Sequence, residues 1–125
     1  MSLDASGDPA SIVFPAASEW RRRPQQQIIS FQRRELSLIL GVYGRMLTSG
    51  MARDYAIDHL ADRAVFSIFR RSRETPLYRI EKRPRDAQRQ GAWSVGSPGA
   101  GVLKRGRDLA QVLKVFDRKL IRAVE

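Results

Sequence analysis

Residues 54–82, DYAIDHLADRAVFSIFRRSRETPLYRIEK, decide the fold because they contain three successive strand patterns. An alternation of apolar and polar residues from Asp54 to Leu60 is followed by the apolar run 64–69 and by a second alternating segment at 77–82. A period of two is typical of strands that bury one face, and the short polar connections between the three patterns favour hairpins. We therefore expect three consecutive antiparallel strands.

Upstream of these strands the sequence changes to the period of a helix. Apolar residues recur every three or four positions from Leu36 to Leu47, which predicts a helix over residues 33–48. Two glycines inside this helix, Gly41 and Gly44, each cost about 1 kcal/mol relative to alanine. We expect them to be present because they admit close contact with a sheet or with a second helix.

Downstream of the three strands, two more strand patterns and a second helix follow. Residues 92–95 and 102–104 are strand-like, and a glycine-rich connection joins them. The last helix is expected to begin at Asp108, which has the spacing of a capping box with Gln111. One face of this helix is apolar, and the other has cations toward its C-terminal end, where the helix dipole favours them. These cations are Lys114, Arg118 and Arg122.

The order of elements predicts the α+β class, with an antiparallel sheet of four to five strands covered on one face by two helices. A short β-type run at 28–31 would add a strand before the first helix. The chain has 125 residues, the length of one domain. Residues 1–26 have no helical or alternating period, so we expect them to form a disordered N-terminal tail and residues 27–125 to form a single domain. Within the tail, Ile12-Val13-Phe14 and Trp20 are apolar enough to dock on the domain or on a protein partner.

The composition argues against several classes of protein. The sequence has no cysteine and one histidine, which excludes disulfides, thiolate metal sites and any site with two imidazoles. No apolar run approaches the ~20 residues of a membrane span, and the N-terminus lacks the pattern of a signal peptide. We therefore expect a cytoplasmic protein that makes no membrane contact.

No catalytic machinery is expected either. On a strand, Asp54 and Asp58 would lie about 13 Å apart, too far for a pair of cooperating carboxylates. The glycine-rich loop at 96–101 is followed by a strand pattern, whereas a phosphate-binding loop opens a helix. We therefore predict no enzyme activity, no catalytic or metal-binding residues and no cofactor.

Charge is the strong signal in this sequence. The 23 Lys and Arg residues exceed the 13 Asp and Glu residues, for a net charge of +10. Residues 60–107 alone contain 12 Lys and Arg and four Asp and Glu, a net charge of +8. Arginine forks match phosphate oxygens, so such a surface would attract a polyanion. A high-GC genome also favours arginine over lysine, but exchanging one for the other leaves the net charge unchanged.

These residues lead to one preferred function and one alternative. We expect a non-enzymatic basic module that contacts the backbone of DNA or RNA in a regulatory role. The alternative is a protein–protein interaction adaptor or a homodimeric regulator with an acidic partner. The cations could form two separate clusters or a stripe across the open sheet face through Arg79. The candidate nucleic-acid-binding residues are Arg70, Arg71, Arg73, Arg79, Arg83, Arg85, Arg89, Lys104, Arg105 and Arg107.

Aromatic side chains that could stack on bases are present, but a place in the core is the stronger interpretation. Trp93 and Tyr78 both lie in strand patterns, where large aromatic residues usually pack inward. We therefore assign the expected binding to cations and the backbone phosphates.

Several separated motifs carry a resemblance to a known family. They are ELSLIL (35–40), YGRM (43–46), RDYAID (53–58), DRAVFSIFRR (62–71), PLYRIEKRP (76–84) and LKRGRDLAQVLKVFDRKL (103–120). In these motifs the chain resembles a small alphaproteobacterial family catalogued as a domain of unknown function, over about residues 28–122. The resemblance implies a bacterial cytoplasmic protein and supplies no activity. A weaker likeness is topological, since helix, three strands and helix is also the order of double-stranded-RNA-binding domains; the extra strand patterns depart from that plan.

Overall fold

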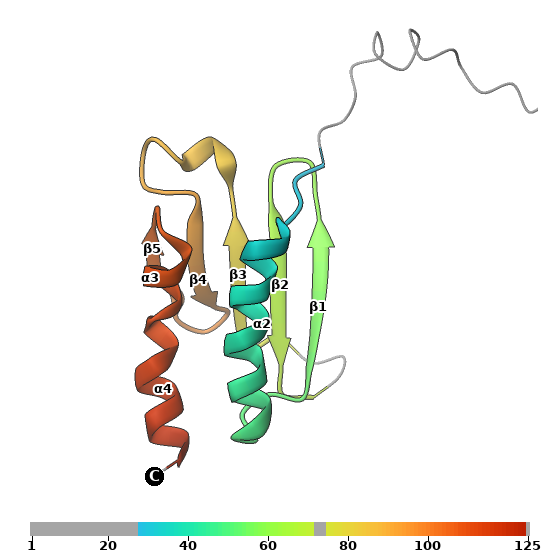
Figure 1. Ribbon diagram of the computed structural model, residues 1–125, viewed down its shortest axis with the longest axis vertical. Coiled ribbons are helices and arrows are strands. Elements are labelled where there is room, and N and C mark those ends of the chain that lie inside the picture. Colours follow the sequence, from blue (N-terminus) through green and yellow to red (C-terminus); the bar gives the residue numbers. More distant parts are fainter. Residues whose placement is uncertain (1–27, 72–74, 125) are drawn as a thin grey trace, which may run out of the picture.

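The computed structural model describes residues 28–71 and 75–124, which form an α+β fold. Within these residues five strands make one antiparallel sheet in the order β1-β2-β3-β4-β5, so each strand pairs with its neighbours in sequence (Figure 1). The prediction of an antiparallel sheet with two helical regions against it is confirmed. The elements are α2 (Arg33–Thr48), β1 (Asp54–His59), β2 (Ala64–Phe69), β3 (Tyr78–Lys82), the 3-10 helix η1 (Pro84–Asp86), β4 (Trp93–Ser97), β5 (Gly101–Gly106), α3 (Leu109–Leu113) and α4 (Val115–Val124).

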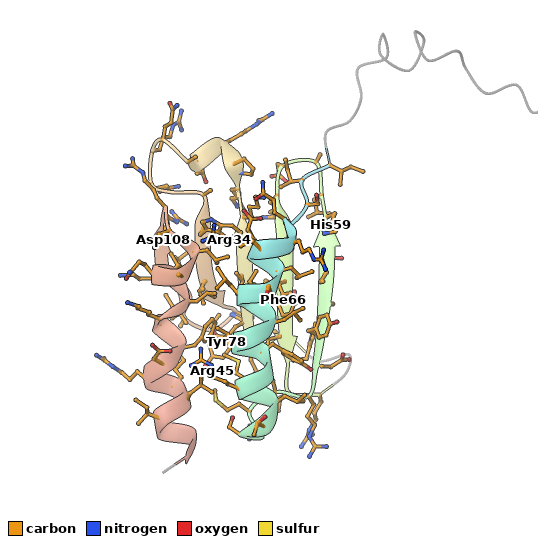
Figure 2. The ribbon with its side chains drawn as sticks, viewed as in Figure 1. Arg34, Arg45, His59, Phe66, Tyr78 and Asp108 are labelled. Atoms are coloured by element: carbon orange, nitrogen blue, oxygen red, sulfur yellow. The ribbon has the colours of Figure 1, made fainter. Side chains whose placement is uncertain are left out.

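Both helical regions cover the same face of the sheet (Figure 1). Phe66 of β2 lies opposite Ile80 of β3, and residues directly opposite each other share a face. The Phe66 ring lies 6.1 Å from the ring of Tyr43 in α2. On the same face, Tyr78 of β3 lies 5.1 Å from the ring of Phe116 in α4. Figure 2 shows Tyr78 in the space between α2 and α4.

One apolar core lies between the sheet and the helices. Phe66, Ile80 and Val95 are fully buried from the sheet side, and Ile39 and Phe116 are fully buried from the helix side. The helical and alternating apolar patterns of the sequence form this core. Burying each such side chain stabilises the fold by about 1.5–3 kcal/mol.

The predicted strand at 28–31 is wrong. No strand is formed there, although the Ile29 N–H donates a hydrogen bond to the Leu60 carbonyl over 2.8 Å. The Phe31 ring stacks on Trp93 at a centroid distance of 6.1 Å. The segment is therefore held by the hydrogen bond from Ile29, by a hydrogen bond that Lys82 Nζ donates to the Ser30 carbonyl and by the packing of Phe31, without a ladder of strand hydrogen bonds.

The last helix also differs from its prediction, because it is broken at Lys114 into α3 and α4. The Lys114 N–H bonds to the carbonyl of Gln111, three residues back, which tightens the turn at that point. The capping box expected at Asp108 is not formed, since this side chain makes no cap hydrogen bond. At the start of α2, by contrast, Glu35 accepts a hydrogen bond of 2.8 Å from the Gln32 N–H.

The two glycines of α2 do not serve close packing, so that prediction is wrong. A Cβ added at Gly41 or at Gly44 would meet no atom within 4 Å. Both residues border open space between α2 and the last two helices.

None of the described helices combines the length and the apolar composition that crossing a membrane requires.

Candidate nucleic-acid interface

The candidate cations lie in several separate places, and the first is the end of β2. Arg70 and Arg71 are exposed there. The Arg53 N–H donates a hydrogen bond of 2.9 Å to the Phe69 carbonyl, which places Arg53 beside them. The predicted Arg73 lies outside the described residues. This end of the sheet therefore has a small cluster of three exposed arginines.

Two further candidates lie on the sheet face that the helices leave open. Arg79 is opposite Ser67 and Arg105 is opposite Ser94, and both arginines are exposed. The same face includes Asp58 of β1 and Glu81 of β3, which both pair with Val65 of β2, one from each side. The charge of this face is mixed. A coherent cationic stripe through Arg79, one of the two arrangements expected from the sequence, is therefore not formed among the described residues.

Two candidates, Arg83 in the loop after β3 and Arg107 after β5, make hydrogen bonds at this loop. Arg83 Nε donates a hydrogen bond of 3.0 Å to Glu81. The Arg107 guanidinium donates to the backbone carbonyls of Ala87 and Gln88, at 3.2 and 3.0 Å. Both arginines therefore have structural partners within the protein.

Two candidates in this loop remain exposed to solvent. Arg85 and Arg89 lie on either side of the half-buried Asp86. They lie at the opposite end of the strands from Arg70 and Arg71, because β2 and β3 are antiparallel and the loop follows the far end of β3 (Figure 1). The two arginine-rich loops are therefore separated by the length of the strands.

The most coherent cationic feature is a groove between β5 and the α3 and α4 helices, which we call the basic groove. Its volume is about 580 Å³. All four of its charged lining residues are cations, and no ion pair among the described residues joins them to a carboxylate. The lining residues are Leu103, Lys104, Gln111, Lys114, Val115, Arg118 and Lys119.

Two local features place the cations around this groove: a bulge in β5, and the positions of Lys114 and Arg118 at the junction of α3 and α4 and in α4. A register shift pairs Val95 with Lys104 but Gly96 with Val102, so Leu103 is an extra residue in β5. Such a bulge redirects side chains locally. Val95 faces the core, so Lys104 emerges on the helix side of the sheet. Lys114 lies at the junction of α3 and α4, and Arg118 lies four residues further along in α4.

An aromatic ring lies next to the basic groove. Lys119 is half-buried, and its Nζ atom lies 5.6 Å from the centre of the Tyr78 ring. Burial raises the pKa of Tyr78 above its ordinary value of 10.0. The phenol is therefore neutral at pH 7, and its ring can stabilise the ammonium group that lies against it.

Of the predicted candidates, only Lys104 lines the basic groove. Sequence reasoning missed three further cations, Lys114, Arg118 and Lys119. In the sequence, Lys114 and Arg118 are four residues apart, but the helix dipole alone explains why cations lie toward the end of this helix. That spacing alone does not reveal that the outer edge of the sheet lies alongside.

The aromatic residues lie mostly on the covered face. Trp93 is buried, and Tyr78 is half-buried against Phe116. Phe69 is the one aromatic residue that the described strands place on the open face. That face therefore lacks the cluster of rings that a base-stacking platform uses.

Comparison with known proteins gives one match. A family model described as a protein of unknown function (DUF2794) matches residues 29–113. No curated protein and no solved structure matches the chain. The resemblance to a family of unknown function, stated from the motifs of the sequence, is confirmed.

Proposed function

We propose that this protein is non-enzymatic and binds nucleic acid through the basic groove. The chain belongs to the family of proteins of unknown function (DUF2794) whose model matches residues 29–113. One observation carries this proposal. Four cations from β5 and the last two helices line a single groove, and no carboxylate lies among its lining residues. An unneutralised cationic groove attracts the phosphate backbone of DNA or RNA.

The groove offers cations from both helices. Lys114 lies at the junction of α3 and α4, and Arg118 lies four residues further along in α4, so each can contact a different phosphate of one strand. Lys104 would approach the same backbone from the sheet side. Lys114 and Lys104 are exposed and flexible point charges, while the Arg118 fork can bind a phosphate through two hydrogen bonds.

Contacts of this kind do not read the base sequence. Phosphate contacts fix position and orientation, whereas sequence is read from base edges or stacked bases. The open sheet face offers little for stacking. We therefore propose that the protein binds the nucleic-acid backbone independently of base sequence. Its regulatory role would come from covering the nucleic acid to which it is bound. Arg85 and Arg89 do not line the basic groove and are not part of the proposed site.

Fluorescence anisotropy with four probes of equal length tests the proposal: duplex DNA, duplex RNA, single-stranded DNA and single-stranded RNA. A groove variant combines Lys104→Gln, Lys114→Gln and Arg118→Gln. The logarithm of affinity should then depend less steeply on the logarithm of salt, with the slope reduced by about one for each lost phosphate contact. The wild type should bind at least one of the probes.

A matched control removes the same charge from the end of β2. It combines Arg53→Gln, Arg70→Gln and Arg71→Gln, which are also exposed. The control should keep the wild-type slope. An equal loss in both variants would mean that binding follows net charge alone, and a loss confined to the control would move the site to β2.

The same experiment addresses the alternative of an acidic protein partner. An acidic protein surface would also be attracted to four unpaired cations. If no probe binds at low salt, while the groove variant loses a partner captured from a nuclease-treated extract, the alternative replaces our proposal.

A further inference from the structure

A second groove, between α2 and α4, differs in chemistry from the basic groove, and we call it the apolar groove. Its volume is about 890 Å³. Leu120 and Ile121 line it from α4, and Gly44 and Thr48 line it from α2. Ile121 is 60% exposed. The basic groove uses Val115, Arg118 and Lys119, which lie on another side of α4, so the two grooves are distinct surfaces.

The apolar groove has room for incoming side chains. A Cβ at Gly44 would meet no atom within 4 Å, so the backbone of α2 borders open space. Arg45 and Asp117 also line the groove and form an exposed ion pair of 3.6 Å that connects the two helices. Figure 2 shows Arg45 between them. Apolar side chains that fill such a groove would gain about 25 cal/mol for each square ångström removed from water.

We propose that the apolar groove binds an N-terminal segment of the same chain, residues 11–15, which read SIVFP. Twenty-seven residues precede the described part of the chain, and this segment is the cluster of large apolar side chains among the first nineteen. Ile12, Val13 and Phe14 would occupy the groove against Leu120 and Ile121. This contact is separate from the nucleic-acid site proposed above.

Charge favours this occupant over a second copy of the protein. Residues 1–20 contain Asp4, Asp8 and Glu19 and no Lys or Arg, for a net charge of −3. Residues 28–125 contain 20 Lys and Arg and 10 Asp and Glu, for a net charge of +10. Residues 1–20, which include the uncharged segment SIVFP, and residues 28–125 therefore attract each other, whereas two copies of residues 28–125 with the same positive charge repel.

The length of the connecting chain is also suitable. Thirteen residues lie between Phe14 and Ile28, and a flexible chain of that length has a root-mean-square extension of about 20 Å. Ile28 precedes the N-terminal end of α2, and Gly44 and Thr48 lie about 16–22 Å further along the helix axis. A linker that matches the required span gives a local concentration in the millimolar range, so weak apolar contacts suffice.

Paramagnetic relaxation enhancement tests the contact in the full-length protein. The chain has no cysteine, so Ser11→Cys provides a single position for a nitroxide label. The amide signals of Gly44, Thr48, Leu120 and Ile121 should broaden strongly. The amides of Val65 and Ser67, on the open face of the sheet, should stay sharp.

Two variants and one control make the result specific. Phe14→Asp removes an apolar contact, and Gly44→Leu places a side chain in the groove at a position where a Cβ meets no atom within 4 Å. Each variant should abolish the broadening while the dispersed spectrum of the folded domain persists. Ser18→Asp adds the same charge outside the apolar segment and should leave the broadening in place. Equal broadening on both faces of the domain, or broadening that survives Phe14→Asp, would overturn the proposal.

A mixed sample separates the segment from a second copy. Isotope-labelled protein without nitroxide is combined with nitroxide-labelled protein at natural isotope abundance. Contact within one chain predicts no broadening of the isotope-labelled amides. Broadening of the groove amides in this mixture would mean that the segment crosses to another molecule and would contradict the intramolecular contact.

Discussion

At the scale of single residues, Gly91 is the position that the backbone constrains most tightly. Its φ is +94°, a conformation that side chains rarely adopt, and it lies at the end of the loop that Arg107 braces. A Cβ at this position would overlap the backbone carbonyl of Gly106. Gly91→Ala should therefore lower the free energy of unfolding by more than about 2 kcal/mol, from strain and steric overlap together.

Urea denaturation measures this loss, and Gly99→Ala is the matched control. A Cβ at Gly99 would meet no atom within 4 Å, and its φ lies outside the left-handed region. The control should change the free energy of unfolding by less than about 0.5 kcal/mol. Equal stability of both variants would mean that the loop relaxes freely and does not need the close approach of Gly91 to β5.

Burial of tyrosine predicts a loss of stability in alkaline solution. Burial raises the pKa of Tyr78 and, together with the nearby Asp54 and Tyr55, that of Tyr43, above the ordinary value of 10.0. The unfolded chain therefore releases these protons first as the pH rises through about 10. The free energy of unfolding should fall above that pH and be unaffected by these groups below it.

Urea denaturation at increasing pH measures the effect. Tyr78→Phe removes one ionisable phenol but keeps the ring against Phe116, so the decline above pH 10.0 should become shallower. The comparison of the wild type with the Phe variant isolates the contribution of this tyrosine. An unchanged decline in Tyr78→Phe would show that this phenol ionises alike in the folded and unfolded chains.

At the scale of elements, the patterns with a long continuous apolar face were predicted best. The bounds of α2, Arg33–Thr48, agree with the prediction because a helical stripe of four turns is hard to mistake. The run at 28–31 was misassigned because Phe31 packs against Trp93 instead of joining a strand ladder, and no local period in the sequence can show such packing. The break at Lys114 was missed because the apolar stripe continues through it in sequence.

The candidate site was predictable only in its chemistry. The excess of cations is evident from the composition, but their grouping depends on the bulge beside Leu103 and on the way α3 and α4 pack beside β5. Lys104 was identified because it adjoins other basic residues in sequence. Arg83 was also identified, although Glu81, two residues before it, accepts its hydrogen bond. Tertiary packing therefore decides which cations are available.

An ion pair that connects two elements offers a test of how they are held together. Lys82 of β3 lies 2.8 Å from Glu35 in the first turn of α2, and their side chains are 15% and 20% exposed. Lys82 Nζ also donates to the Ser30 carbonyl over 3.0 Å. A double-mutant cycle with Lys82→Met and Glu35→Gln should give a coupling energy of about 1–3 kcal/mol, since burial strengthens the pair.

The pair between Arg45 and Asp117 is the exposed counterpart. Its side chains are 57% and 52% exposed, and its atoms lie 3.6 Å apart. The corresponding cycle with Arg45→Gln and Asp117→Asn should give only about 0.2–1 kcal/mol. A coupling for Lys82 and Glu35 as small as this would mean that packing alone holds α2 to β3.

At the scale of the whole molecule, the distribution of charge matters more than its total. The folded part also contains cations at both ends of the sheet and on its open face, and among these Arg63, Arg83 and Arg107 contact carboxylates or backbone carbonyls. The basic groove concentrates four cations that have no such partner among the described residues. A polyanion should therefore engage one side of the molecule, rather than all of it.

This localisation fixes the expected dependence of affinity on salt. If the four cations of the basic groove each contact one phosphate, the logarithm of the association constant should fall with the logarithm of salt concentration at a slope of about −3.6 on duplex DNA and about −2.8 on a single strand. Anisotropy titrations across a salt series measure both slopes. A slope near −7 on duplex DNA would correspond to about eight phosphates, which needs the arginines of β2 or of the loop after β3 as well, and would contradict a single groove. A slope close to zero would mean that counterion release does not drive binding.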